Sequence, residues 1–372
     1  MGAQPAFDLA PALRLMLLGS AVALGPLAWV WIRNRQASAA HRLSALTLLV
    51  LFLTFDLVLF GAFTRLTDSG LGCPDWPGCY GSASPSGAHA EISAEQARLP
   101  SGPVTHSKAW IEMIHRYLAT GVGVLILTLA VASWLGHRQG RLPVSPAWPA
   151  LTLLWVCIQG AFGALTVTMR LFPAIVTLHL LGGMVLLALL TRQAVAYAQA
   201  RRGAGAHAVP RPARAWLGIA FAVLWLQLAL GAWVSTNYAV LACSEFPTCQ
   251  GSWWPAMDFA QGFEVWRELG LTGAGEHVTF AALTAIHYAH RLAAYLVLAV
   301  LGVTAWRLWR GPLERQARWI GALAVWQLAS GLSNVVLGWP LVAAVAHTGG
   351  AAALVIVLTW ALCESRVAEA RP

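Results

Sequence analysis

The stretch LSALTLLVLFLTFDLVLFGAFT, residues 43–64, decides the fold, because it is one continuous apolar run. A helix needs about 20 apolar residues to cross the hydrocarbon core of a bilayer, and this run is long enough. Further runs of the same kind lie on either side of it. Together, nine runs fall near residues 15–32, 43–64, 107–135, 144–169, 171–192, 213–235, 278–306, 317–338 and 341–363. The sequence therefore predicts an all-α polytopic membrane protein.

The composition agrees with that prediction. Of the 372 residues, 58% are hydrophobic and 10% are charged. A soluble protein of this length could not hide so much apolar surface. The first run lacks a clear small-residue cleavage site and is followed by Arg33-Asn34-Arg35. We therefore expect it to be a retained helix rather than a signal peptide.

The net charge of +9 comes from arginines that cluster in alternate loops. The positive-inside rule places such loops in the cytoplasm. The basic charge thus indicates a membrane topology rather than a nucleic-acid partner, and membrane lipid is the expected surrounding. We expect a multi-pass protein of a bacterial inner membrane with a cytoplasmic C-terminus. The N-terminus and two long loops, near 65–106 and 236–277, would be periplasmic.

Two parts of the chain resemble each other. Gly61-Ala62-Phe63 ends one apolar run, and Gly231-Ala232-Trp233 ends another. A cysteine follows each glycine after 12 residues and a second one after 18 residues. Each cysteine loop leads to a helix with a His-Arg pair, and each part ends in a helix with a histidine and a following glycine pair. The His-Arg pairs are His115-Arg116 and His290-Arg291, and the histidines of the last helices are His179 and His347.

The repeat predicts two four-helix transmembrane bundles of the same orientation, plus one extra N-terminal transmembrane helix. Repeats that begin on the same side of the membrane are parallel and are related by an axis along the membrane normal. The expected parts are the extra helix with its cytoplasmic connection (1–42), the N-terminal bundle (43–200), a linker (201–214), the C-terminal bundle (215–363) and a cytoplasmic tail (364–372).

The four loop cysteines form two pairs with the same spacing, Cys73/Cys79 and Cys243/Cys249. In an oxidising periplasm each pair is expected to form a small disulfide loop. A thiol metal site and free thiols are the alternatives, and redox-active cysteine pairs remain open. Cys157 and Cys363 lie in apolar runs, where we expect inert packing residues.

Four histidines inside the expected spans form two matched pairs, His115 with His179 and His290 with His347. An ionisable side chain within a span is costly and is usually functional. At about 1.5 Å of rise per residue, all four lie in the outer half of the bilayer. Two imidazoles at one depth on two helices can ligate a haem iron from both faces. Zinc fits less well, because it would need more protein ligands at that depth.

The neighbours of these histidines differ between the two parts. Arg116 and Arg291 follow a histidine in both parts, and each could pair with a haem propionate or extend to the outer headgroups. Three residues before the first His-Arg stands Glu112, whereas the second part has His287. Glu112 shares a helix face with His115. It could therefore move protons near the iron, or it could hydrogen-bond a neighbouring helix.

With these features together, the sequence resembles the haem A synthase family from about residue 43 to 363. The resemblance rests on T-R-L-T-x-S-G-L at 64–71, C-P-x-W-P-x-C at 73–79, Glu112-Met113-Ile114-His115-Arg116 and the paired histidines. It implies a core of two four-helix bundles, and the extra N-terminal helix is the departure from the family pattern.

Carried over residue by residue, the resemblance implies two haem sites. The substrate haem O would be held by His115 and His179, with Arg116 and Arg65 nearby. Haem b would be ligated by His290 and His347, with Arg291 nearby. Glu112 would be the essential carboxylate.

The implied reaction oxidises the C8 methyl group of haem O to the formyl group of haem A, which a-type terminal oxidases use. Two hydroxylations give a gem-diol that loses water, so protons and electrons must move near the haem. The implied partners are a haem O synthase, cytochrome oxidase assembly factors and an unidentified electron-transfer partner. The alternatives are a di-haem b-type cytochrome that only transfers electrons and a haem transporter. The difference between Glu112 and His287 argues against the cytochrome.

Overall fold

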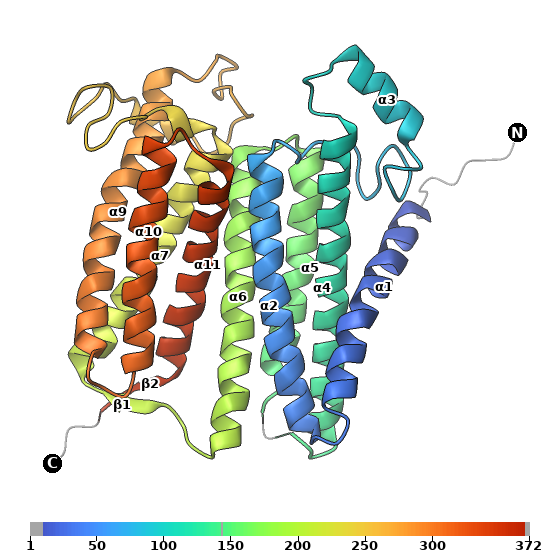
Figure 1. Ribbon diagram of the computed structural model, residues 1–372, viewed down its shortest axis with the longest axis vertical. Helices are drawn as coiled ribbons and strands as arrows, with labels where there is room; N and C mark the ends of the chain where they lie inside the picture. Colours follow the sequence, from blue (N-terminus) through green and yellow to red (C-terminus); the bar gives the residue numbers. More distant parts are fainter. Residues whose placement is uncertain (1–9, 143, 369–372) are drawn as a thin grey trace, which may run out of the picture. The chain divides into compact units, whose positions relative to one another are not determined.

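The structure is a computed structural model that describes residues 10–142 and 144–368. Within these residues, nine helices are long and apolar enough to cross a membrane. They are α1 (Ala10–Arg33), α2 (Ala39–Leu66), α4 (His106–Arg138), α5 (Ala147–Thr168), α6 (Pro173–Arg202), α7 (Arg211–Thr236), α9 (Phe280–Leu308), α10 (Glu314–Val336) and α11 (Leu341–Cys363), as Figure 1 shows. Each one contains most of one apolar run expected from the sequence, so the prediction of nine spans is confirmed.

Short elements lie in the connections between the long helices. They are α3 (His89–Arg98), η1 (Ala239–Leu241), α8 (Phe259–Gly262) and the parallel strands β1 (His207–Val209) and β2 (Ser365–Val367). The sequence did not predict them, because each is too short to produce a periodic pattern.

Side-chain caps fix where α4 and α9, the two helices with a His-Arg pair, begin. Thr105 precedes α4 and accepts a hydrogen bond from the Lys108 N–H at 3.3 Å. Thr279 precedes α9 and accepts one from the Ala282 N–H at 3.2 Å. A threonine at this position satisfies an otherwise unpaired donor of the first turn. The two helices therefore begin at nearly the same point relative to their His-Arg pairs.

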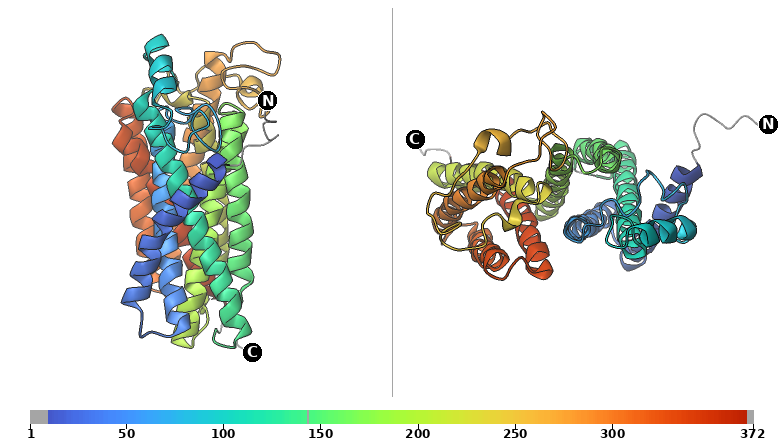
Figure 2. Two further views of the ribbon diagram at one scale, coloured as in Figure 1. Left: turned by 90° about the vertical axis from the view of Figure 1, so that its right-hand side faces the viewer. Right: turned by 90° about the horizontal axis from the view of Figure 1, so that it is seen from above.

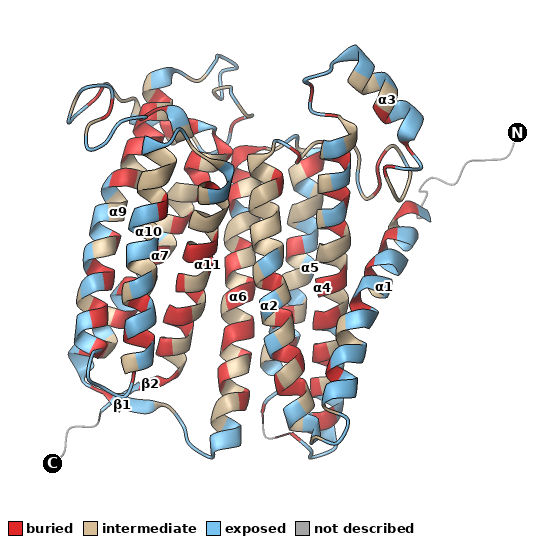
Figure 3. Cartoon of the chain, viewed as in Figure 1, coloured by how far each residue is buried: buried red, intermediate tan, exposed pale blue. Residues whose placement is uncertain are grey.

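Large apolar side chains lie exposed along the helices, which is unlike the surface of a soluble protein. Exposed positions follow the helices as well as the loops (Figure 3), and they include Phe52, Leu154, Trp306 and Val342. This distribution fits helices that face lipid.

The chain divides into two compact units, residues 1–171 and 172–372. In the first unit, α4 packs against α1, α2 and α5. The extra helix α1 approaches α4 closely at Gly19, where an added Cβ would lie 2.4 Å from Thr120 Cγ2. This close approach requires a glycine, because a larger residue would push the two helices apart.

The second unit contains α6 to α11 with the two strands. Its helices α7, α9, α10 and α11 contact one another in cyclic order, and they lie around a common centre when viewed from above (Figure 2). Helix α6 packs against α7 and α11. The division of function at the linker 201–214 stays a prediction, and the contacts group α6 with the helices that follow it.

The linker and the C-terminal segment are tied together beside the second unit's helices. Strands β1 and β2 pair in parallel, and Arg202 forms an ion pair with the buried Glu364 at 2.8 Å. The Gln199 amide donates to the Cys363 carbonyl at 3.0 Å. These contacts fix the ends of α6 and α11 to each other.

Candidate functional site

The loop cysteines form two disulfides, as the repeated spacing predicts. Cys73 is bonded to Cys79 and Cys243 to Cys249, and in both bonds the Cα atoms lie 4.9 Å apart. The structure thus favours disulfides over free thiols or a thiol metal site.

An acidic side chain closes the turn after the second cysteine of each loop. Asp75 accepts hydrogen bonds from the Tyr80 and Gly81 N–H groups at 2.6 and 2.8 Å. Glu245 accepts one from the Gly251 N–H at 3.0 Å. Gly81 and Gly251 have φ angles of 70° and 71°, which favour glycine. This explains why a glycine follows two residues after each pair. Burial raises the pKa of Tyr80, and the nearby Glu95 and Asp75 carboxylates raise it further. The Tyr80 phenol therefore stays neutral.

Glu112 and Arg116 hold the first disulfide loop on α4. Glu112 is 4% exposed, and its Oε2 accepts a hydrogen bond from the Cys73 N–H at 2.8 Å. Its Oε1 forms an ion pair with Arg116 at 2.5 Å. Arg116 also donates to the Asp75, Pro77 and Gly78 carbonyls. The guanidinium is thus committed to the loop, and this favours loop anchoring over a propionate contact.

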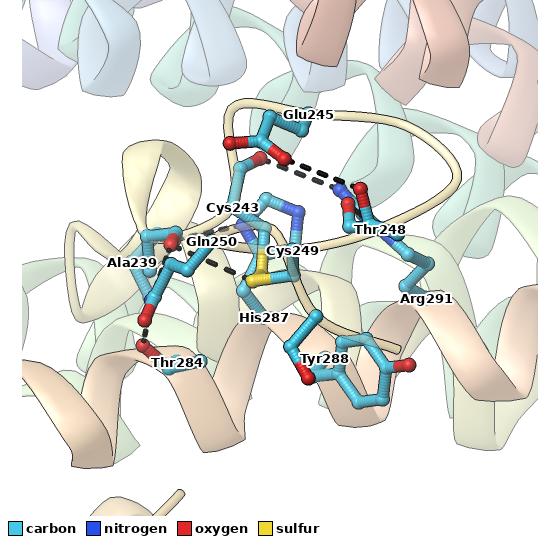
Figure 4. Close-up of a disulfide and its surroundings, with 12 residues drawn as sticks. Ala239, Cys243, Glu245, Thr248, Cys249, Gln250, Thr284, His287, Tyr288 and Arg291 are labelled. Carbon is cyan, nitrogen blue, oxygen red and sulfur yellow. Dashed lines mark hydrogen bonds between the residues drawn. A yellow bond between two sulfur atoms is a disulfide. The ribbon is translucent and has the colours of Figure 1, made fainter. Parts of the chain in front are cut away.

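Helix α9 holds the second disulfide loop in a related way (Figure 4). Arg291 donates to the Thr248 and Cys243 carbonyls at 2.9 and 3.3 Å. The buried His287 places Nδ1 3.0 Å from the Ala239 carbonyl. The two counterparts therefore contact their loops with opposite polarity, since Glu112 accepts from backbone N–H and His287 donates to backbone C=O.

His115 lies in the first unit on α4, against α2. Its ring is stacked with Phe60, with centroids 6.1 Å apart and planes 7° apart. An added Cβ on Gly61 would lie 3.1 Å from His115 Cε1. The glycine at the end of the α2 run thus gives the imidazole room. Arg65, near the end of the same helix, lies 3.3 Å from Asp68 and is largely buried.

His179 lies in the second unit on α6. Its Nδ1 is buried and has no hydrogen-bond partner among the described residues. Burying a polar nitrogen without a partner is costly, so a donor or metal that engages the imidazole would remove a penalty.

His290 on α9 and His347 on α11 belong to the same unit. Each faces a glycine of a neighbouring helix. An added Cβ on Gly231 of α7 would lie 2.8 Å from His290 Cε1, and one on Gly331 of α10 would lie 3.2 Å from His347 Cε1. Both imidazoles thus depend on a glycine opposite them.

Two glutamines near these histidines were not identified from the sequence. Gln227 of α7 donates to the His290 carbonyl at 3.2 Å, and Gln327 of α10 donates to the His347 carbonyl at 2.9 Å. Each stands four residues before the glycine that faces the same histidine. A search for Gln-x-x-x-Gly within the spans would have found both.

Asp56 was also missed, although a carboxylate within a span is a functional signal in itself. It lies on α2, one helical turn before Phe60, and is exposed. Its neighbours Leu48 and Phe52 on that helix face are exposed as well.

The paired histidines fit haem better than a metal ion held by protein ligands alone. In the part of the chain that the structure describes, no three His, Cys, Asp or Glu side chains group to hold a metal ion. Haem brings four nitrogen ligands of its own and needs at most two from the protein. His290 and His347 offer two partly buried imidazoles in one unit, and the buried His290 Nδ1 has no hydrogen-bond partner in the described residues.

Comparison with known proteins finds one family over most of the chain. The family described as COX15-CtaA, cytochrome oxidase assembly protein, matches residues 44–359. A Shewanella oneidensis protein named Heme A synthase is 37% identical over 85% of this chain and 94% of its own length. Heme A synthases of Methylobacterium radiotolerans and Halalkalibacterium halodurans are 31% and 26% identical, over 85% and 82% of this chain and 87% and 89% of their own lengths.

Proposed function

The chain belongs to the COX15-CtaA family of cytochrome oxidase assembly proteins, and from this premise we propose that it is a haem A synthase. It oxidises the C8 methyl group of haem O to the formyl group of haem A. One structural observation supports this reaction above the others. The His-Arg helix of the first unit carries a buried, hydrogen-bonded carboxylate, Glu112, where its counterpart carries His287.

The substrate and the cofactor take different histidine pairs. His115 and His179 hold haem O, with Arg65 and Arg116 as the nearby arginines; Arg65 is paired with Asp68 and Arg116 donates to the disulfide loop. His290 and His347 hold haem b, with Arg291 fixing the loop beside them. When bound, haem b supplies one-electron transfer. The support for this pair is its location in one unit, with a glycine opposite each ring.

Glu112 handles protons during the oxidation. Oxidising a methyl group to a formyl group releases protons, and a positioned carboxylate can accept them at Oε1 or Oε2. The Cys73 N–H and the Arg116 guanidinium hold the two oxygens in place. Since Glu112 stands three residues before His115 on α4, the carboxylate and the imidazole lie within one helical turn.

The architecture and the membrane orientation follow the sequence pattern. We propose two parallel-repeat four-helix bundles, with the N-terminus and both disulfide loops in the periplasm and the C-terminus in the cytoplasm. The support is the repeated anchoring of each disulfide loop to a His-Arg helix. Haem O synthase supplies the substrate, oxidase assembly factors receive the product, and the electron partner docks from outside the chain.

Co-expression with a haem O synthase, followed by pigment extraction, tests the function. The native chain should yield haem A and haem b. Glu112→Gln should keep haem b and accumulate haem O or a partly oxidised product, with haem A lowered by about 100-fold, the scale for loss of a positioned proton-transfer group. An amide can keep one of the two Glu112 contacts, so we expect a loss of stability of about 1–3 kcal/mol.

His287→Gln is the matched control, because it makes the same residue at the counterpart position. Its amide can still donate to the Ala239 carbonyl, so haem A production should stay within a few-fold of the native chain. Normal haem A from Glu112→Gln would show that the carboxylate is structural. Two haem b per chain with neither haem O nor haem A would indicate an electron-transferring cytochrome instead.

A further inference from the structure

His347 is held by side chains of α10. The Gln327 amide donates to the His347 carbonyl at 2.9 Å, and Gly331 leaves room for its ring. In addition, Ser330 Oγ lies 2.9 Å from His347 Nδ1. The three residues lie within five positions of one helix, so α10 fixes both the backbone and the ring of His347.

The hydroxyl of Ser330 determines which ring nitrogen carries the proton. Ser330 Oγ also lies 2.7 Å from the Trp326 carbonyl, four residues earlier, and a carbonyl can only accept. The single hydroxyl proton is therefore used in that bond. Towards His347 the oxygen acts as an acceptor, and Nδ1 must carry the proton. In the neutral ring, Nε2 then has a free lone pair, which is the form that ligates a metal.

His179 and His290, the other proposed iron ligands of the second unit, lack this arrangement. Nδ1 of His179 and Nδ1 of His290 are buried and have no hydrogen-bond partner within residues 10–142 and 144–368. The sequence carries the same contrast. Ser330 stands 17 residues before His347, and at 17 residues before His179 the chain has Phe162, which has no hydroxyl. The hydrogen bond thus distinguishes His347 both from His290, the other proposed haem b ligand, and from His179, a proposed substrate-haem ligand.

We propose that Ser330 is a positioning residue, which fixes His347 as a strong and permanent axial ligand of haem b. The proposal rests on the proposed function, in which His347 ligates haem b. An Nδ1–H that donates a hydrogen bond makes the imidazole a better electron donor and holds the ring plane. A resident cofactor benefits from such a ligand, whereas a substrate haem has to leave. The absence of a hydroxyl at Phe162 fits a haem that exchanges.

Ser330→Ala tests the role, with Ser333→Ala as the matched control. Ser333 lies on the same helix, is only partly buried, and makes the same bond to a carbonyl four residues earlier, at 2.7 Å. Alanine is the best helix former, so both variants should fold. The readouts on purified protein are haem b per chain, the rate of haem b loss to apomyoglobin, and the midpoint potential of haem b.

We expect Ser330→Ala to hold haem b about 10- to 100-fold less tightly, the usual effect of removing such a hydrogen-bond partner. The midpoint potential should move to a more positive value, because a weaker donor stabilises ferric iron less. Ser330→Thr keeps the hydroxyl and should restore both properties, and Ser333→Ala should resemble the native chain.

Three results would overturn the role of Ser330. They are an unchanged potential and retention in Ser330→Ala, an equal loss in Ser333→Ala, and a failure of Ser330→Thr to restore the native values. His347→Ala shows whether a negative result refutes only the role of Ser330 or also the proposed ligation of haem b by His347. If His347→Ala loses haem b while Ser330→Ala matches the native chain, the ligand assignment stands and the positioning role is wrong. If His347→Ala keeps haem b, the ligand assignment itself is wrong.

Discussion

Gly231 gives the sharpest steric test of the proposed haem b site. An alanine there would place its Cβ 2.8 Å from His290 Cε1, closer than Cβ atoms come to other atoms in real structures. The imidazole is the end of a side chain, so it can rotate away while α7 and α9 keep their packing. Overpacking of this kind costs about 1–3 kcal/mol. The displaced group is the proposed iron ligand, so this cost weakens haem binding. We expect the affinity for haem b to fall by about 5- to 150-fold.

Two other glycines calibrate the measurement. Gly331→Ala would bring a Cβ to 3.2 Å from His347 Cε1, which a small ring movement can relieve, so its effect should be smaller. Gly218 also lies on α7, and an added Cβ there would meet nothing within 4 Å beyond its own helix turn, so Gly218→Ala should bind haem b as the native chain does. The assay is haem b per chain from the pyridine haemochrome spectrum, with the folded fraction checked by size-exclusion chromatography. Normal haem b in Gly231→Ala would show that α7 does not set the position of His290.

Two more predictions follow from the disulfides and the ligand pair. Alkylation of unreduced, denatured protein followed by mass spectrometry should leave Cys73, Cys79, Cys243 and Cys249 unmodified and label the free Cys157 and Cys363, whereas labelling at all six positions would contradict the disulfides. His290→Ala and His347→Ala should each lose the b-type absorbance without loss of the folded chain, and survival of haem b in both would contradict the ligand assignment.

The spans and the disulfides were predictable because both depend on local sequence. A helix such as α2 needs only its own apolar residues to cross a bilayer, and its bounds, Ala39–Leu66, extend the predicted run 43–64 at both ends. The cysteine pairs are six residues apart, so each bond closes within one loop. The repeat then supplied a check, since an accidental spacing would not occur twice.

The contacts of Arg116, Arg291 and Ser330 were not predictable, because they depend on which helix faces which loop. A propionate contact for the two arginines was a reasonable expectation from charge alone. In the structure, backbone carbonyls of the disulfide loops take those donors. Ser330 lies 17 residues from His347, on another helix, and becomes its neighbour only when α10 packs on α11. Such contacts require knowledge of packing, which sequence periodicity does not supply.

The contrast between Glu112 and His287 bears on what the carboxylate is for. Both side chains reach from a His-Arg helix to a disulfide loop, and both loops keep the same internal turn. His287 shows that a neutral, hydrogen-bonding side chain can serve such an attachment. Holding the loop therefore does not require a carboxylate. A buried carboxylate is costly unless it is paired, and Glu112 is accompanied by an ion pair with Arg116 that His287 does not need. Since a neutral side chain suffices at the counterpart position, we propose that the carboxylate serves chemistry that needs a group able to take up and release a proton beside His115.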